Sequence, residues 1–527
     1  MGRQKQVIDF AGRTTAARWR GTFAAAVLAL TIIPAIPLVI AALRGSSDHS
    51  LWSEAFIKAL MTSLGLAICV AVVSLGVGMP LGLLAALYRS PRRPMLLVAQ
   101  ALPLLLPSFL LAIGWRNLPA VGLPTGLFPP SGFSGAVLVM GLQSAPLPLL
   151  ATWAACHNLT ASQIDAARLH GGERIVLRRS AMACAPVAII AALLAGILSL
   201  SDPGAAQVFR CPSAAMEIRT SFAALGDRVL AARQCLVMAG VALLLTAPVL
   251  CVGLPRLAAA VLARQTRPVV PYRHRLLGRA GQAGLVALIV FAVGLPTVGL
   301  CLPAIERPMF ARAAKTVWDT APATLVYTLG AAAVAVLLAT ALALLATHCF
   351  RLRLVVLAAL MVLLALPPAL GAIGVVHAAT AAPSWLDWLT RSQLTVAVVL
   401  GLRLLPLAAV AMMRAVGSFS PSWSDAASLH GVPKLRYLRS VTLPVLMPTI
   451  LIGLLLVAVL AAADVTTTHL LQPPGRASLP LAVFTIMANS PEGLVASLCL
   501  LYLLGVVLLT LVATTLSAWL LGKWKTS

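Results

Sequence analysis

The segment DAARLHGGERIVLRRS, residues 165–180, resembles DAASLHGVPKLRYLRS, residues 425–440, and the two are identical at 8 of 16 positions. The two copies begin 260 positions apart in a chain of 527 residues. In the wider alignment, residues 143–180 match residues 403–440 at 13 of 38 positions without a gap. One fixed spacing over so long a stretch predicts that the chain consists of two similar halves.

The same spacing recurs in a second, separate block of the sequence. There Leu106, Pro107, Leu110, Ala112, Ile113 and Gly114 align with Leu366, Pro367, Leu370, Ala372, Ile373 and Gly374. Because two blocks share one offset, chance similarity is a poor explanation. We therefore expect the second half to repeat the first along most of its length.

The composition is typical of an integral membrane protein. Hydrophobic residues make up 60% of the chain and charged residues 10%, with a mean hydropathy of +0.98. A soluble domain is about half apolar and a quarter charged. The net charge of +25 raises nucleic acid as an alternative partner. However, the basic residues lie in short loops between apolar runs and form no aromatic-rich patch, so we expect a lipid bilayer and no nucleic acid.

The nine cysteines are scattered, and no pair has CxxC spacing. Most lie inside apolar runs, where cysteine behaves as a small buried hydrophobe. This pattern predicts neither a disulfide framework nor a zinc site. The sequence has no GxxxxGK[ST] phosphate loop and no soluble stretch large enough for an ATPase domain, so we expect no cofactor and no metal on this chain.

Twelve apolar stretches are long enough to span a bilayer, which takes about 20 residues. Their rough limits are 21–43, 56–87, 95–116, 133–157, 181–200, 231–254, 281–304, 319–347, 354–380, 392–414, 441–465 and 491–520. The first follows several basic residues, as in a signal peptide, but is longer than the roughly 7–15 apolar residues of a signal peptide core. We expect an uncleaved first span and an all-α integral membrane protein with about 12 transmembrane helices.

The distribution of charge predicts the orientation of these spans. With the N-terminus inside, the cytoplasmic segments hold 26 Lys and Arg against 4 Asp and Glu, and the outer segments hold 12 against 10. Lysine and arginine favour short cytoplasmic loops. We therefore expect a multi-pass protein with both termini in the cytoplasm.

The predicted spans divide into two halves of six. Residues 1–254 form the first half and residues 281–527 the second, and a basic segment with three prolines, residues 255–280, is expected to be a cytoplasmic linker. Because each half has an even number of spans, the halves are parallel repeats with a pseudo-twofold axis along the membrane normal. Such an axis predicts a pathway between the halves.

Both copies of the repeated segment have the same predicted helix start and stop. A serine stands three residues before an aspartate, at Ser162–Asp165 and Ser422–Asp425, which is a pattern that begins helices. The glycines Gly171 and Gly431 follow, and glycine can take the left-handed conformation that ends a helix. Each copy is therefore predicted to form a helix of about two turns.

Both predicted helices lie in cytoplasmic loops, at about 158–184 and 418–444. Their paired alanines leave a smooth face that suits the groove of another protein, and basic residues follow. The alternative is an ordinary interfacial turn whose cations only anchor the topology. Two copies on one side of the membrane favour docking onto a partner with twofold symmetry.

The two loops resemble the EAA motif of ABC import permeases, which reads Glu-Ala-Ala, three residues, Gly, nine residues and then Ile-x-Leu-Pro. The second loop has Asp425-Ala426-Ala427, Gly431 and then Val441-Thr442-Leu443-Pro444. The first has Asp165-Ala166-Ala167 and Gly171, but Ala183-Cys184 in place of Leu-Pro. Over nearly the whole chain, the sequence is most similar to the fused two-half permeases of the iron(III), thiamine, polyamine and phosphonate import group.

This resemblance implies a permease subunit of a bacterial ABC importer in the inner membrane. Its EAA helices would be coupling helices, one on each subunit of a homodimeric cytoplasmic ATPase, and that ATPase would bind ATP and Mg. A periplasmic binding protein would deliver the solute. The permease would be a transport subunit that catalyses no covalent reaction.

Four residues are candidates for the solute pathway or its gate: Asp202, Asp464, Arg403 and Gln143. Ionisable groups within spans are costly and commonly functional. The two aspartates stand at corresponding ends of the fifth and eleventh predicted spans. We expect them to face the interface between the halves near the outer side; the alternative is that each is solvated or caps a backbone turn.

Arg403 lies deeper in its span and aligns with Gln143, so its charge occurs in one half only. It is a candidate contact for an anion or a gate paired with an acid such as Asp464, and a structural cation is the alternative. The two carboxylates favour a cationic or metal-bearing solute if they line the pathway.

An ion-coupled secondary transporter is the main alternative function, because such proteins can also have twelve spans and parallel halves. It would need protonatable residues deep in the bundle and would lack docking loops. A membrane-embedded enzyme would need a catalytic cluster such as HExxH, and the sequence has none. We therefore expect ATP-driven import by alternating access.

Overall fold

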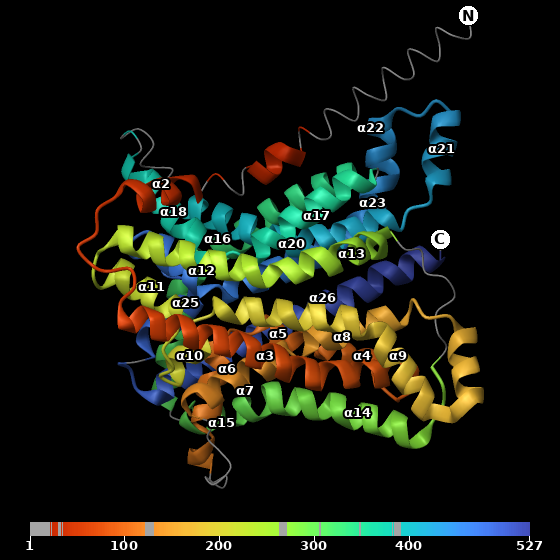
Figure 1. Ribbon diagram of the computed structural model, residues 1–527, viewed down its shortest axis with the longest axis horizontal. Coiled ribbons are helices and arrows are strands. Elements are labelled where there is room, and N and C mark those ends of the chain that lie inside the picture. Colours follow the sequence, from red (N-terminus) through yellow and green to blue (C-terminus); the bar gives the residue numbers. More distant parts are fainter. Residues whose placement is uncertain are drawn as a thin grey trace, which may run out of the picture.

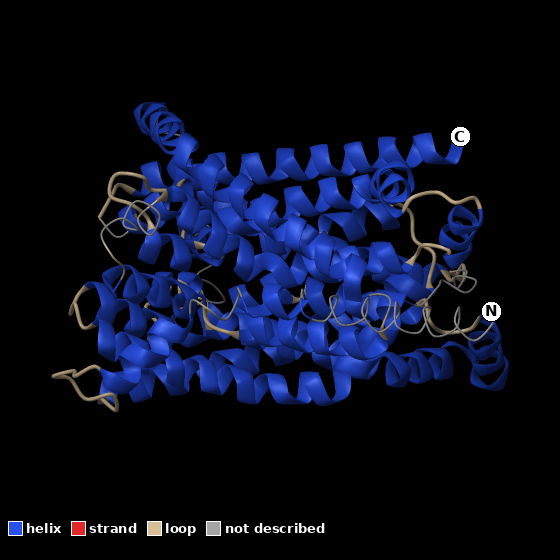
Figure 2. Cartoon of the chain, turned by 90° about the horizontal axis from the view of Figure 1, so that it is seen from above, coloured by secondary structure: helices blue, strands red, loops and turns tan. Residues whose placement is uncertain are grey.

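The described part of the chain is built from helices that run along the long axis of the molecule (Figures 1 and 2). The computed structural model describes residues 22, 24–29, 33, 35–121, 131–262, 271–304, 307–346, 349–381, 383, 392–487 and 489–526. Within these residues the only strand-like feature is an isolated β-bridge between Tyr88 and Tyr272. The described residues are therefore all-α, as predicted.

Within the same residues, nine helices are long and apolar enough to span a membrane, or up to eleven if each of two bent pairs is one span. The first set comprises α3 (Glu54–Leu87), the bent pair Arg93–Leu105 (α4 and α5) with Ser108–Arg116 (α6), Gly132–Cys156 (α7 and α8), α9 (Ala161–Leu200) and Arg228–Ala258 (mainly α12). The second set comprises Arg275–Ala304 (α14 and α15), α16 (Arg307–Ala346), the bent pair α17 (Phe350–Ala365) with α18 (Pro368–Ala381), α20 (Gln393–Gly417), Leu435–Ala463 (mainly α23) and α26 (Glu492–Thr526).

Eleven of the twelve predicted spans therefore have a helix or a bent pair in the described structure. The exception is the first, residues 21–43, of which α2 (Ala35–Arg44) and the helical residues 24–29 are described. The remainder of that stretch and residues 263–270 of the predicted linker lie outside the described residues.

The two bent pairs break at equivalent prolines. The first pair bends by 92° at Pro107 and the second by 86° at Pro367, which lies 260 residues later. Proline disfavours the α conformation in the residue before it. Leu106 and Leu366 accordingly have ψ angles of 141° and 140°. The repeated proline thus explains why both helices stop and turn at the same place.

The helices of the two sets pack in the same order. Helix α3 packs against α8 and α9, and α16 packs against α20 and α23. Several contacts cross between the sets; among them, α15 (Leu295–Ala304) lies against α6, and α2 lies against α18. A Cβ atom on Gly299 of α15 would lie 2.0 Å from the Gly114 carbonyl oxygen of α6. Small residues permit this close approach of helices, as is common in membranes.

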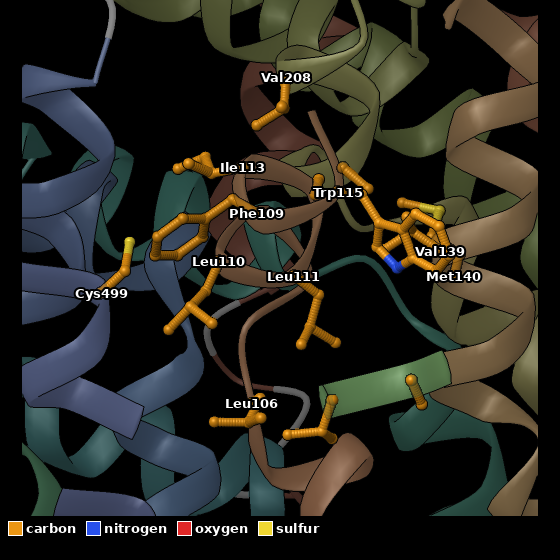
Figure 3. Packing of buried hydrophobic residues seen from close by; sticks show 14 of the residues in the cluster. Leu106, Phe109, Leu110, Leu111, Ile113, Trp115, Val139, Met140, Val208 and Cys499 are labelled. Carbon is orange, nitrogen blue, oxygen red and sulfur yellow. The ribbon is translucent and has the colours of Figure 1, made fainter. Parts of the chain in front are cut away.

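The largest buried cluster surrounds α6 and joins both sets of helices. Phe109, Leu110 and Trp115 project from α6 toward Met140 of α7 and Cys499 of α26 (Figure 3). The Phe109 ring also meets the ring of Phe484 edge to face, with centroids 5.6 Å apart. Because this cluster combines distant parts of the chain, the two sets of helices share a common core.

Large apolar side chains also line the outside of the long helices. Val72 on α3, Leu244 on α12 and Leu337 on α16 are 65%, 74% and 70% exposed. So many exposed large apolar side chains are uncommon in soluble monomers. They match the lipid-facing surface of a multi-pass membrane protein.

Candidate docking loops and central cavity

The first docking loop, residues 158–184, contains a short helix that begins at Thr160. The Thr160 side chain and Gln163 form a reciprocal capping box at the start of α9. The predicted start at Ser162 was therefore wrong by two residues. The stronger signal is Thr160 followed three residues later by Gln163, since a capping box pairs Ser or Thr with Glu or Gln.

The short helix of the first loop ends at a pair of glycines. Gly171 is extended, with φ −178°, and Gly172 takes the left-handed conformation, with φ +64°. The prediction that Gly171 is the left-handed residue was wrong, because the loop offers two adjacent glycines. A Cβ atom at Gly171 would lie 2.0 Å from the Ile175 side chain, whereas no atom lies within 4 Å at Gly172.

The second docking loop, residues 418–444, contains α21 (Pro421–Leu429). Ser420 is its N-cap, and Pro421 occupies the first turn, where proline loses no hydrogen bond. The predicted start at Ser422 was thus also two residues late. Gly431 has φ +65°, as predicted, and the next residue, Val432, donates its N–H to the Ala427 carbonyl at 2.9 Å.

Both docking loops lie at the same end of the molecule, where α26 also ends (Figure 1). The predicted docking residues are accessible there: Asp165, Ala166, Gly171, Asp425, Ala426 and Gly431 are exposed, and Ala167 and Ala427 are half-buried. These eight residues form two separate surfaces, one on each loop.

Two leucines that sequence reasoning missed dominate these surfaces. Leu169 is 88% exposed and Leu429 is 86% exposed, and they occupy equivalent positions of the repeat. A single exposed leucine is common on protein surfaces. The identical Leu-His pair in both quoted segments was the available signal, and it places an apolar knob on each loop.

The first docking loop is tied to the body of the molecule by an ion pair and an aromatic clamp. Arg168 Nε donates to Glu173 Oε1 at 2.7 Å, and the Tyr88 hydroxyl donates to Glu173 Oε2 at 2.6 Å. The Arg168 guanidinium also lies over the Tyr272 ring, 4.0 Å from its centroid. Burial, reinforced by the hydrogen bond to Glu173, raises the pKa of Tyr88. We call Tyr88, Arg168, Glu173 and Tyr272 the clamp.

The clamp includes a residue of the predicted linker, Tyr272, whose backbone is hydrogen-bonded to the end of α3 and the residues after it. Tyr272 N donates to the Leu87 carbonyl at 2.9 Å, and Arg89 N donates to the Tyr272 carbonyl at 3.0 Å. The start of the second set of helices is thereby fixed beside the first docking loop. Below the loop, a cavity of 580 Å³ opens between the short helix and the part of α9 that follows the glycines; its lining includes Ala166, Ala167, His170, Ile175 and Arg179.

The four predicted pathway residues line one cavity of 240 Å³ between the two sets of helices. Asp202 and Gln143 come from the first set, and Arg403 and Asp464 come from the second. The aspartates follow the ends of α9 and α23 that are distant from the docking loops. Both bent pairs contribute walls, through Pro107 and through Leu364 and Pro368.

Arg403 and Asp464 form an ion pair in this cavity. The Asp464 carboxylate also caps α24 (Val465–Leu471), accepting from Thr467 N and from Thr467 Oγ1, each at 3.0 Å. Its side chain is only 4% exposed, whereas that of Arg403 is 30% exposed. Asp464 therefore both caps a backbone turn and faces the cavity, so the two interpretations considered for it are not exclusive.

Asp202 and Gln143 are also held by hydrogen bonds. Asp202 Oδ1 accepts from Gly204 N at 2.8 Å, and the Ser108 hydroxyl is a second partner of the carboxylate. Gln143 Nε2 donates to the Leu106 carbonyl at 2.8 Å, at the bend before Pro107. The cavity thus contains two anchored carboxylates and one guanidinium, and this balance favours a ligand with positive charge.

A comparison with known families found a match for one part of the chain, which contains the second docking loop. Residues 335–525 match the family described as binding-protein-dependent transport system inner membrane component. This part of the chain is therefore similar to a membrane component of such transport systems. Comparisons with curated proteins and with solved structures found no match.

The matched region includes Arg403, Asp464 and the whole of α21. The first docking loop, with Asp202 and Gln143, lies outside the match. Its similarity to the matched region rests on the sequence repeat and on the equivalent bends at Pro107 and Pro367.

Proposed function

We propose that the chain is the fused, two-half permease subunit of a bacterial ABC importer. It moves a small periplasmic solute into the cytoplasm by alternating access. A homodimeric cytoplasmic ATPase, which binds ATP and Mg, docks on the two loops, and a periplasmic binding protein delivers the solute at the opposite end. The docking loops and both termini are cytoplasmic in this arrangement.

The observation that carries this proposal is the pair of docking loops at one end of the molecule. Each presents a short helix, a left-handed glycine and a leucine that is more than four-fifths exposed. One exposed leucine alone is common, but the same exposed apolar side chain at equivalent positions of both loops supports a shared contact with a partner. Two such sites match a partner with two identical subunits.

The cavity between the sets of helices is the proposed solute pathway. ATP binding draws the two docking loops together, and the bundle swings to face outward; hydrolysis returns it to the inward-facing state. The permease supplies the path and the coupling, and the ATPase supplies the energy. Solutes of the iron(III), thiamine, polyamine or phosphonate type are the candidates, and the two carboxylates in the cavity favour the cationic ones.

One observation supports the alternative of an ion-coupled secondary transporter. The Arg403–Asp464 pair lies within the bundle, where transporters place charged relays. Such a transporter would work without an ATPase. The two functions therefore make opposite predictions for a purified system.

The deciding experiment is ATPase activity of the complex reconstituted with its ATPase and binding protein, measured with ferric chelates, thiamine, polyamines and aminophosphonates. Gly431→Pro should abolish solute-stimulated turnover, because proline cannot adopt φ +65°. Gly226→Pro is the matched control, since Gly226 also has a positive φ, +68°, and open space where a Cβ atom would lie, but it is outside both loops. Transport by the permease alone, without any ATPase, would favour the ion-coupled alternative.

A further inference from the structure

Two buried cysteines meet at the base of the first docking loop. Cys156 Sγ and Cys184 Sγ lie 3.4 Å apart, although the residues are 28 positions apart in the chain. Each is only 1% exposed. Cys156 ends α8 (Pro146–Cys156) and Cys184 lies in α9 beyond the glycine break, so the whole docking helix lies between the two sulfurs.

The expectation that all nine cysteines are only small buried hydrophobes does not account for this pair. In the part of the chain that the structure describes, Cys156 and Cys184 are the one pair of cysteines whose sulfurs are in contact. The positions equivalent to the pair in the second loop are Val416 and Pro444. Thiol chemistry is thus possible at the base of the first docking loop and impossible at the base of the second.

The surroundings of the pair leave a path for a small oxidant. The two sulfurs belong to a small apolar cluster with Leu83 and Ala86 of α3, and Leu159 packs against it. Leu159 and Ala183, the neighbour of Cys184, also line the 580 Å³ cavity below the docking helix. A molecule the size of hydrogen peroxide that enters this cavity is therefore close to the pair.

We propose that Cys156 and Cys184 form a reversible disulfide that locks the first docking loop when the cytoplasm becomes oxidising. Hydrogen peroxide is the two-electron oxidant: one thiol releases its proton, the thiolate attacks an oxygen and the O–O bond breaks. The leaving hydroxide takes up that proton, so that a sulfenic acid and water form. The second thiol then attacks the sulfenic sulfur, so that an S–S bond forms and a second water leaves. A reducing cytoplasm restores both thiols.

The bond would act on the loop through its two stems. A disulfide brings the sulfurs from 3.4 Å to about 2.05 Å. The chain segment before the docking helix, which ends α8, is then bonded to the segment after it, in α9. The helix could then no longer pivot against α8 during ATPase closure. That consequence rests on the proposed function, whereas the formation of the bond does not.

The first test is chemical. The complete permease–ATPase complex is treated with hydrogen peroxide, alkylated with N-ethylmaleimide and digested without reductant for mass spectrometry. We expect a linked Cys156–Cys184 peptide that dithiothreitol removes, that Cys184→Ser lacks and that Cys235→Ser retains. Alkylated thiols at both positions, in samples where the exposed Cys251 and Cys301 are oxidised, would overturn the proposal.

The second test measures the lock. Hydrogen exchange of residues 160–180 should slow on oxidation in the wild type and not in Cys184→Ser. Solute-stimulated ATPase activity should fall by at least about fivefold, the lower end of typical coupling effects, and recover with dithiothreitol. A linked peptide with unchanged exchange would refute the lock. Slowed exchange in a complex that lacks solute-stimulated activity even when reduced would support the lock and count against the proposed function instead.

Discussion

The two docking loops share a repeated motif but are attached to the molecule in different ways. In the first loop, Arg168 and Glu173 connect the short helix to Tyr88 and Tyr272. The equivalent positions in the second loop are Ser428 and Pro433, so this ion pair cannot form there. A repeated segment can therefore keep its docking surface while its mechanical support diverges.

The central cavity shows the same divergence at its polar side chains. Gln143 in the first set satisfies the Leu106 carbonyl at a helix bend, whereas its repeat partner Arg403 pairs with Asp464. Both side chains lie beside a proline break, but only one brings a charge. The two sets of helices thus share the backbone bend at the proline, but the polar side chains beside the bend make different interactions in each set.

Removing one partner of the cavity ion pair should have the largest effect. Asp464→Asn leaves Arg403 without its carboxylate and weakens the cap on α24, so we expect a loss of about 2–3 kcal/mol in unfolding free energy. Breaking a buried pair typically costs about 3–5 kcal/mol, and the 30% exposure of Arg403 lowers that figure. Thermal unfolding of the permease in detergent measures the loss.

The control for this prediction is a double variant that has the same residue at positions 143 and 403, which are equivalent in the repeat. The double variant Arg403→Gln with Asp464→Asn carries glutamine at both repeat positions and removes both members of the ion pair, while Asp202 keeps its hydrogen bond to Gly204 N. It should be more stable than Asp464→Asn alone, since removing both partners of a polar contact costs less than removing one. Equal stability of the two variants would show that the ion pair contributes little.

Charging the exposed leucines tests whether both loops dock. Leu429→Asp should weaken ATPase association by about 2 kcal/mol, or roughly 30-fold in Kd, because a buried interface anchor is replaced by a desolvated charge. Folding should be unaffected, since the side chain is 86% exposed. Binding of the purified ATPase to the permease in nanodiscs gives the two Kd values.

Leu169→Asp is the matched variant in the first loop. An equal effect would mean that the loops dock equally in spite of their different attachment. An effect confined to Leu429 would mean that the first loop, whose motif departs at Ala183 and Cys184, has lost its docking role.

The clamp itself should have a smaller effect. Glu173→Gln removes the charge between Arg168 and Tyr88, and we expect a cost of about 1 kcal/mol because the pair is partly exposed. Hydrogen exchange of residues 160–170 should become faster, with no change in residues 421–429. The reciprocal experiment places the pair in the second loop by Ser428→Arg with Pro433→Glu, and slower exchange there would show that the pair is sufficient for support.

Local sequence patterns predicted most of the backbone. Hydropathy located eleven helices or bent pairs, because bilayer-length apolar runs are a local signal. The prolines at 107 and 367 were recognised as aligned positions of the repeat, whereas glycines predicted the ends of the docking helices. The helix starts were misplaced because several Ser and Thr residues near each start could serve as the N-cap. The structure has Thr160 and Ser420 as the N-caps.

The contacts that distinguish the two loops were not predictable in this way. Tyr88, Glu173 and Tyr272 are separated by up to 184 positions in the sequence, and no local pattern brings them together. Cys156 and Cys184 are likewise 28 positions apart, so a search for CxxC spacing does not find their contact. By contrast, the Arg403–Asp464 pairing was among the options considered, because deep charges in a bundle have few partners to choose from.

The smallest expected difference concerns pH at the end of the molecule opposite the docking loops. Asp227 caps α12 (Arg228–Pro248) and accepts from Ser47 Oγ at 2.6 Å, with His49 Nδ1 3.2 Å away; the equivalent position in the repeat is Met487. Burial alone would raise the pKa of Asp227, but the Leu230 amide, Ser47 and His49 hold it below its usual value.

A carboxyl group with a lowered pKa stabilises the fold when it is ionised, so its contribution is complete above its unfolded pKa of about 3.9 and is lost as the pH falls through the folded value. The melting temperature should therefore decline below about pH 4 more steeply in the wild type than in Asp227→Asn. The two curves should converge in acid, because a protonated aspartate caps the helix no better than asparagine does. Parallel curves would mean that other carboxylates cause the loss of stability in acid. They would also mean that the Asp227 interactions do not distinguish the stability of the two sets of helices.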